Sequence, residues 1–471
     1  MTTLFRRAVP LTLASLSTLA AGLSACADIG PDEPIAEAAA AVCTPPASVD
    51  PARSLFVTDL PTMSKFGFQR VMDALITTAG VAPQTSLQLY QQWWDLNNDA
   101  AHGASASNPH CDDNGGTVNG FPVECPRQEG ALAFTNPFTA GKDHYTPVGV
   151  VNRFDLAPAD GAHCGQYRVV FGKDSGKTNG ADRNFIIFEA VLPNPDPAAG
   201  LAACLPVAQF WADLSSDGSA TSRAAKIESF FFTGLPGFEP VIHANHYGLV
   251  APTGQIRTNQ FMASTGGQQW ELREYRLREP CTDGTCTLKM KMATVKTNPF
   301  GTLFAGTDAD SLAFQAAFLK QVPKLAAATE PNGVAMTIAN AFNAGESREQ
   351  DTSSQYEFQA SASYANQIQS KLVSIGSTLS STELLRRAST QACAGCHKTE
   401  SNASMGGFNW PPSLGFTHVD ENRNLSAALT GTFLPHRADV LITFITNQCS
   451  GTAVSGSPDV TIGGGPVDAS N

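Results

Sequence analysis

Charged residues are scarce in this 471-residue chain, at 15% of the sequence against ~25% in typical soluble domains. Only 30 residues are Lys or Arg, the formal net charge is −12, and no basic run occurs. Phosphate backbones and anionic membrane surfaces attract proteins with clustered positive charge, which this chain lacks. The composition argues against nucleic acid as a partner. Together with 40 glycines and 30 prolines, it favours an extracytoplasmic protein with long, turn-rich connections.

Common catalytic motifs are also missing. The sequence has no G-x-S-x-G, H-E-x-x-H or G-x-G-x-x-G pattern, so it gives no support for a hydrolase or a nucleotide-binding enzyme. The run "GKDSGKT" at 172–178 lacks the first glycine of a phosphate loop and is predicted to be a turn. "HANH", with His243, His246 and nearby Glu239, lies among strand and loop signals, which favours histidines without a metal. "DLNNDAAHGASA" lacks the glycine and glutamate of a calcium loop and is predicted to be a polar loop.

The first 26 residues have the layout of a secretion signal. Arg6 and Arg7 precede the apolar run "AVPLTLASLSTLAAGL", and "LSAC" follows it, ending in Cys26. This segment resembles a bacterial lipoprotein signal, which implies that Cys26 is acylated and anchors the mature protein. Ala27 in the next position favours the outer membrane. The alternative is an ordinary signal cut nearby, with Cys26 left as a thiol. No later stretch approaches the ~18 apolar residues of a membrane span, so the lipid would be the only anchor.

Ten of the eleven cysteines remain after Cys26, and an even set in an exported chain indicates disulfides. Cys281 and Cys286 bracket "TDGT" between two alternating runs, where Asp283 and Gly284 suit the tight turn of a hairpin, so this pair is predicted first. Three further pairs are suggested by proximity or by what is left over: Cys111 with Cys125, Cys164 with Cys204, and Cys43 with Cys449.

Periodicity divides the chain into helical and β-rich parts. Helical spacing occurs after Thr62, and seven short β-branched and aromatic runs follow between His144 and Phe304, including "KIESFFFTGL". Helical spacing returns from Asp308 and includes "PNGVAMTIANAF" and a capping box at Ser380 and Glu383. We therefore expect a multidomain protein: an antiparallel β-sandwich or barrel-like central domain, flanked by N-terminal helices and a C-terminal all-α module.

The expected divisions follow the composition and periodicity of each segment. They are a signal peptide (1–25), a flexible tether (26–50), a helical N-terminal region with loops (51–143), a β-rich domain (144–305), a helical segment (306–379), a second all-helical module (380–449) and a disordered tail (450–471).

The motif with the clearest chemistry is Cys393-Ala-Gly-Cys396-His397. C-x-x-C-H is the attachment signature for c-type haem, in which two thiols add to the porphyrin vinyl groups and the adjacent imidazole ligates iron. With the helix before it and the closing helix "PHRADVLITFITNQC", residues 380–449 resemble a small c-type cytochrome module. The resemblance implies one covalent haem c held by Cys393, Cys396 and His397. The other interpretations of "CAGC" are a tight disulfide or a thioredoxin-like redox pair, which lacks a βαβ context here.

The sequence departs from this family at the second axial ligand, because no methionine lies between Gly406 and Cys449. His418 is the first candidate for that position, Met405 and His436 are others, and an open sixth position also remains. Two axial ligands favour electron transfer to a redox partner protein or a small-molecule donor or acceptor. An open position favours a haem enzyme such as a peroxidase, so the sequence leaves open whether the protein is an enzyme. The alternative from another class is a disulfide-stabilised cell-surface binding module without haem.

Overall fold

The computed structural model describes residues 43–81, 84–94, 117–123, 135–251, 253–264, 267–349 and 354–451. The described chain, which starts at Cys43, belongs to one compact unit. Cys26, the predicted signal, most of the predicted tail and the suggested Cys111–Cys125 pair lie outside the described residues. None of the helices found in the described ranges combines the length and apolar character needed to cross a membrane.

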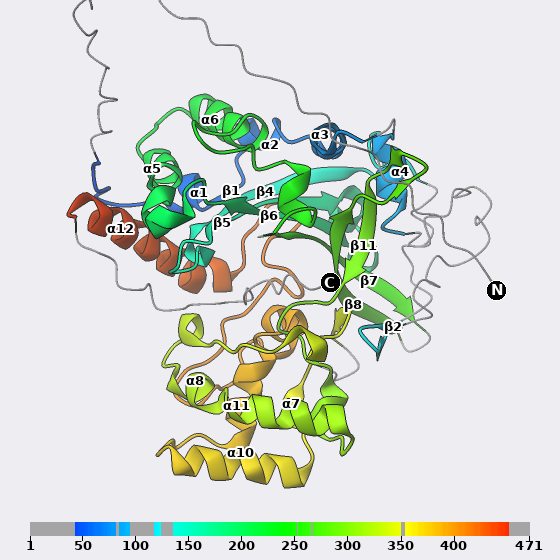
Figure 1. Ribbon diagram of the computed structural model, residues 1–471, viewed down its shortest axis with the longest axis vertical. Coiled ribbons are helices and arrows are strands. Elements are labelled where there is room, and N and C mark those ends of the chain that lie inside the picture. Colours follow the sequence, from blue (N-terminus) through cyan, green and yellow to red (C-terminus); the bar gives the residue numbers. More distant parts are fainter. Residues whose placement is uncertain are drawn as a thin grey trace, which may run out of the picture. The chain divides into compact units, whose positions relative to one another are not determined.

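An eight-stranded sheet forms the centre of this unit, and every neighbouring pair of its strands is antiparallel (Figure 1). The strand order is β1-β4-β5-β6-β7-β8-β11, and β12 also pairs with β8. Its strands are β1 (Phe56–Val57), β4 (Tyr145–Arg153), β5 (His163–Lys173), β6 (Asn184–Pro193), β7 (Gln255–Ser264), β8 (Gly267–Arg278), β11 (Lys289–Ala293) and β12 (Glu346–Arg348). Two small hairpins pair β2 (Thr117–Val118) with β3 (Phe121–Pro122), and β9 (Cys281–Thr282) with β10 (Thr285–Cys286).

Helices precede, interrupt and follow the strands along the chain. In the described ranges they are α1 (Pro51–Ser54), α2 (Leu60–Met63), α3 (Phe68–Ala79), α4 (Ser86–Gln91), α5 (Leu205–Asp213), α6 (Ala220–Phe232), α7 (Ala309–Leu319), α8 (Val322–Ala327), α9 (Tyr356–Gln359), α10 (Ala362–Ser374), α11 (Ser381–Ser389) and α12 (Leu434–Cys449). Two π-helical turns, η11 (Gly395–Thr399) and η12 (Leu429–Phe433), follow α11 and precede α12.

The predicted β-sandwich or barrel is wrong, because the strands form a single sheet. The prediction of a β-rich central region is correct in part. Six of the seven predicted runs are strands of one open sheet, and the edge strand β1 comes from outside the predicted 144–305 range. The seventh run, "KIESFFFTGL", lies mainly in α6, where Ser219 caps the helix and Ile227, Phe230 and Phe231 are buried. Figure 1 shows α3, α5 and α6 along one face of the sheet. Helices therefore bury the apolar side chains that a second sheet would cover in a sandwich.

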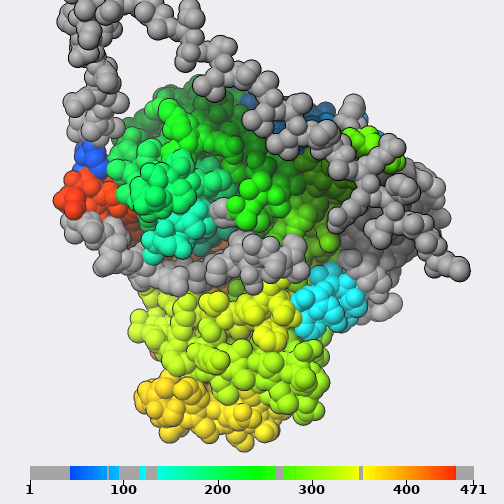
Figure 2. Space-filling view, viewed as in Figure 1, coloured from blue at the N-terminus to red at the C-terminus, as the bar shows by residue number. Residues whose placement is uncertain are grey.

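Helices α7, α8 and α10 give the predicted helical segment, which forms a yellow-green to yellow surface in Figure 2. Within it, the run "GVAMTIANAF" is not a helix. The whole predicted run, "PNGVAMTIANAF" at 331–342, contains only the short 3₁₀ turns η9 (Pro331–Gly333) and η10 (Asn340–Phe342). Val334 and Met336 are nevertheless buried, so the apolar residues of this run pack against neighbouring elements without helical periodicity.

The expected C-terminal all-α cytochrome c-like module is also wrong. Between η11 and the helical turn that begins at Ala427 and leads into η12, residues 400–426 contain no α-helix, so α11 and α12 are not joined into a small bundle. Helix α12 instead packs against α5 and α1, while α11 packs against α8, α9 and α10. The apolar surfaces of these two helices are buried by distant segments, so residues 380–449 share the core of the whole unit.

Three predicted disulfides are confirmed. Cys281–Cys286 closes the β9–β10 hairpin, Cys164–Cys204 connects β5 to the turn before α5, and Cys43–Cys449 joins the start of the described chain to the end of α12. The capping box at Ser380 and Glu383 is present as predicted. These features depend on short spacings or on cysteine parity, which the sequence displays directly.

Candidate functional site

The C-x-x-C-H motif directly follows α11, and this helix fixes its position. Leu384, Leu385 and Ala388 form the buried side of α11. After the helix, the chain tightens into the π-turn η11, in which a Cβ at position 395 would lie 1.8 Å from the Ser389 carbonyl oxygen. Only glycine fits such an approach. Gly395 of the motif therefore allows the two cysteines and the histidine to be folded tightly against the end of α11.

Cys393 and Cys396 are free, half-buried thiols. This differs from the interpretation of "CAGC" as a disulfide. Burial raises the pKa of each thiol to about 12. A thioredoxin-like pair needs a thiol with a lowered pKa, because the thiolate is the attacking species. The environment of these two cysteines therefore argues against dithiol redox chemistry.

His397 is held in one orientation by two contacts. Its Nδ1 lies 3.1 Å from the Phe416 carbonyl oxygen, which can only accept, so Nδ1 carries the proton and Nε2 is left with a lone pair. Trp270 of β8 stacks on its ring, with 5.5 Å between centroids and 23° between planes. Burial lowers the pKa of His397 to about 4, so the imidazole is neutral near pH 7. A neutral histidine whose other nitrogen is bonded to a carbonyl is typical of a metal ligand.

His418 lies beside His397, with 4.5 Å between the ring centroids. Its Nδ1 is 2.9 Å from Ser426 Oγ, and its Nε2 is 3.6 Å from Cys396 Sγ. Metal–nitrogen bonds of about 2.0 Å on opposite sides of one ion would separate two imidazole centroids by about 6 Å. The two rings therefore lie closer together than two opposite axial ligands.

The other two candidates for the axial position are not in this pocket. Met405 is buried in the main apolar core. His436 is half-buried on α12, and its Nε2 makes no hydrogen bond to the described residues. Neither of them lines the pocket, whereas His418 does. Of the predicted site residues, Cys393, Cys396, His397 and His418 are thus brought together, and Cys26 lies outside the described residues.

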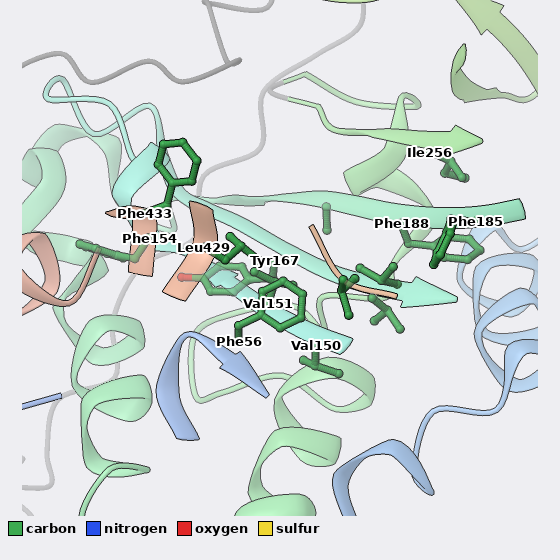
Figure 3. Packing of buried hydrophobic residues seen from close by; sticks show 14 of the residues in the cluster. Phe56, Val150, Val151, Phe154, Tyr167, Phe185, Phe188, Ile256, Leu429 and Phe433 are labelled. Atoms are coloured by element: carbon green, nitrogen blue, oxygen red, sulfur yellow. The ribbon is translucent and has the colours of Figure 1, made fainter. Parts of the chain in front are cut away.

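The pocket that contains the motif lies against one face of the sheet. Its empty space, including the part open to solvent, is about 1130 Å³. Figure 3 shows several of the apolar residues in and around it. The apolar lining consists of Phe56, Val151, Val170, Phe185, Ile187, Leu272, Ala392, Val419, Leu429 and Phe433.

Charged side chains from the strands form the rest of the floor, and the sequence analysis did not identify them. Arg168 of β5 pairs with Glu189 of β6 at 3.0 Å, and Arg257 of β7 pairs with Glu189 at 3.1 Å and with Glu274 of β8 at 2.5 Å. The sequence does contain a signal that could have identified two of these buried charges. Arg168 and Glu189 each interrupt an otherwise apolar strand run, which marks a buried charge when the strand is central.

The motifs set aside in the sequence have different outcomes. "GKDSGKT" is the end of β5 followed by a 3₁₀ turn at Asp174–Lys177, as predicted. Glu239, His243 and His246 do come together, with one potential ligand atom from each within 4.8 Å of the others. However, Nδ1 of His243 accepts the N–H of Asn245, which leaves the proton of a neutral ring on Nε2. This tautomer does not suit a metal ligand at Nε2.

A search of protein-family models, of curated proteins and of solved structures found no match to this chain.

Proposed function

We propose that this chain is an exported, lipid-anchored protein that carries one covalently attached haem c and transfers single electrons in the periplasm or at the cell surface. The observation that carries this proposal is the arrangement of the motif. Two free thiols and a histidine whose Nε2 makes no hydrogen bond to the described residues line one pocket.

Each residue of the motif has a separate part in this function. Cys393 and Cys396 would form the two thioethers, for which they must be unpaired, as they are here. His397 would bind the iron through Nε2, since the Phe416 carbonyl accepts a hydrogen bond from its other nitrogen. The haem, when bound, supplies an iron that changes its charge by one electron.

Aromatic and apolar side chains lie around the motif. Trp270 covers one side of the His397 ring, and the apolar floor and the residues of η12 enclose much of the remaining space. The apolar side chains and the charges around a haem are both factors that set its potential. This environment supports electron transfer with a partner protein or with a small-molecule donor or acceptor.

Three disulfides in the described part of the chain support the exported location, because such bonds persist outside the reducing cytoplasm. The same compartment is where haem attachment to C-x-x-C-H takes place. The acylation of Cys26, with the outer membrane favoured, remains part of the proposal and rests on the resemblance of the first 26 residues to a lipoprotein signal.

The decisive experiment is a pyridine haemochrome spectrum of the protein purified from a host that attaches haem c. We expect an α-band shifted as for a haem with two saturated vinyl groups, and a tryptic peptide containing Cys393 that carries the mass of haem. A colourless protein with an unmodified peptide would contradict the proposal and favour a binding module without haem.

A further inference from the structure

Positive charge is concentrated in the floor and roof of the pocket. The cationic side chains that line it come from three strands, from the segment after β11 and from α12. They are Arg153, Arg168, Arg257, Lys296 and Arg437.

Carboxylates neutralise only part of this charge. Asp155 binds Arg153 at 2.9 Å, and Glu189 is shared between Arg168 and Arg257. Glu274 also binds Arg257. Among the described residues, five cations thus face three carboxylates, which leaves an excess of two positive charges.

Two of the cations have no hydrogen-bonded carboxylate among the described residues. Nε of Arg437, on a side chain only 8% exposed, is 3.8 Å from Asp155, and its guanidinium makes no hydrogen bond to the described residues. The Nζ of half-buried Lys296 makes no hydrogen bond or ion pair within the described ranges. Nearby, the buried Nε of Arg168 also has no hydrogen-bond partner there. Buried charges of this kind are costly unless a counter-charge accompanies them.

We propose that this cation cluster binds two carboxylate groups of one ligand, and that these groups are the propionates of the haem attached at Cys393 and Cys396. The choice of haem as their source rests on the proposed function. Two propionates carry two negative charges, which match the excess of two positive charges. Arginine is suited to this role because its planar N–H groups match the two oxygens of a carboxylate.

The alternative source of the same chemistry is a free dicarboxylate. Haem is favoured because the thiols and the cations line one pocket, so a porphyrin attached to the thiols would occupy the space in which a free ligand would have to bind. If the haem propionates occupy the cluster, the haem-bearing protein should not bind an added dicarboxylate, whereas a site for a free dicarboxylate would still bind it.

The first test uses the double variant Arg437→Gln, Lys296→Met, with Arg70→Gln as a control. Arg70 is exposed on α3 and pairs with Glu228. In the double variant we expect the propionate bending band of the resonance Raman spectrum to shift. We also expect the ratio of reduced to oxidised haem at a fixed potential to fall about tenfold, because two nearby positive charges are lost. The control should change neither. An unchanged propionate band in the double variant overturns the assignment to propionates.

The second test distinguishes the sources by thermal unfolding with added succinate. Succinate should stabilise the haem-free variant Cys393→Ser, Cys396→Ser and leave the haem-bearing protein unaffected. Equal stabilisation of both forms overturns haem as the source and supports a free dicarboxylate. If the wild-type protein is colourless, the proposed function fails, and succinate then tests the cluster alone. Stabilisation of the wild-type protein by succinate that is lost in the Arg437→Gln, Lys296→Met variant supports a carboxylate site at the cation cluster. If succinate does not stabilise the wild-type protein, the carboxylate site is overturned.

Discussion

The two faces of the eight-stranded sheet differ sharply, although the same strands build both. On one face, Phe171 and Phe188 pack with Phe68 of α3, with ring centroids 5.0 to 6.3 Å apart. On the other face, Arg168, Glu189 and Arg257 lie under the pocket. Successive side chains of a strand point to opposite faces, so each strand contributes to both.

This difference suggests that one face mainly stabilises the fold and that the other is suited to binding a ligand. Close-packed aromatic rings stabilise the fold through buried area and favourable ring contacts. A cavity lined by partly neutralised charges does the opposite, since voids and buried charges both reduce stability. The helix-covered face therefore contributes most to the stability of the fold. On the pocket face, a bound ligand would fill the cavity and neutralise the charges, which would offset their destabilising effect.

The largest effect is expected from replacing the two cysteines to which the proposed haem is attached on the pocket face, while the helix-covered face is left unchanged. In Cys393→Ser, Cys396→Ser we expect complete loss of covalent haem with an unchanged far-ultraviolet circular dichroism spectrum, because serine is close to cysteine in size and no disulfide is lost. The control is Cys281→Ser, Cys286→Ser, which removes two cysteines from the β9–β10 hairpin and should retain the haem. Haem bound covalently to the first variant would contradict the assignment.

A pair of phenylalanines compares the faces directly. Phe188→Ala on the helix-covered face should lower the free energy of unfolding by about 3–5 kcal/mol, because it opens a cavity in a closed aromatic cluster. Phe185→Ala, on the pocket face, should cost clearly less, since the new space joins an existing pocket that water can enter. Denaturant unfolding of the haem-free protein measures both. Equal losses of unfolding free energy in the two variants would contradict the proposed difference in packing between the two faces.

The pH dependence of stability tests the charge on the pocket face. Burial lowers the pKa of Lys296 to about 8, from its usual 10.5. Between these pH values the unfolded chain holds a proton that the folded chain has lost, so the free energy of unfolding should rise with pH across this window. The rise should be about 1–3 kcal/mol in the haem-free protein. It should be absent in Lys296→Met, and identical pH profiles for the two proteins would show that Lys296 is not desolvated.

The smallest expected effect is that of replacing His418, which should leave the proposed haem attached. If His418 is the second axial ligand, His418→Ala should convert a six-coordinate absorption spectrum to a five-coordinate one and allow carbon monoxide to bind the reduced haem. Met405→Ala is the comparison, because Met405 does not line the pocket. An unchanged spectrum in His418→Ala would exclude His418 as a ligand. Carbon monoxide binding to the unaltered protein would then favour a haem enzyme.

Local features of this chain were predictable because nearby residues determine them. The C-x-x-C-H spacing, the capping box at Ser380 and the hairpin closed by Cys281 and Cys286 depend on a few neighbouring positions. Most strands were also recognisable from their β-branched and aromatic runs. The error at "KIESFFFTGL" has the same origin, because a short apolar run fits a strand or a buried helix equally well.

The tertiary structure alone decided what surrounds the motif. The sequence supplied the two thiols and His397, but not the Phe416 carbonyl that fixes the imidazole, nor Arg437 and Lys296 beside the pocket. It also suggested an independent C-terminal module, whereas α12 packs against α5 and α1. Spacing along a chain determines local geometry. Which surfaces meet depends on the packing of the whole core, and residues far apart in sequence become neighbours only there.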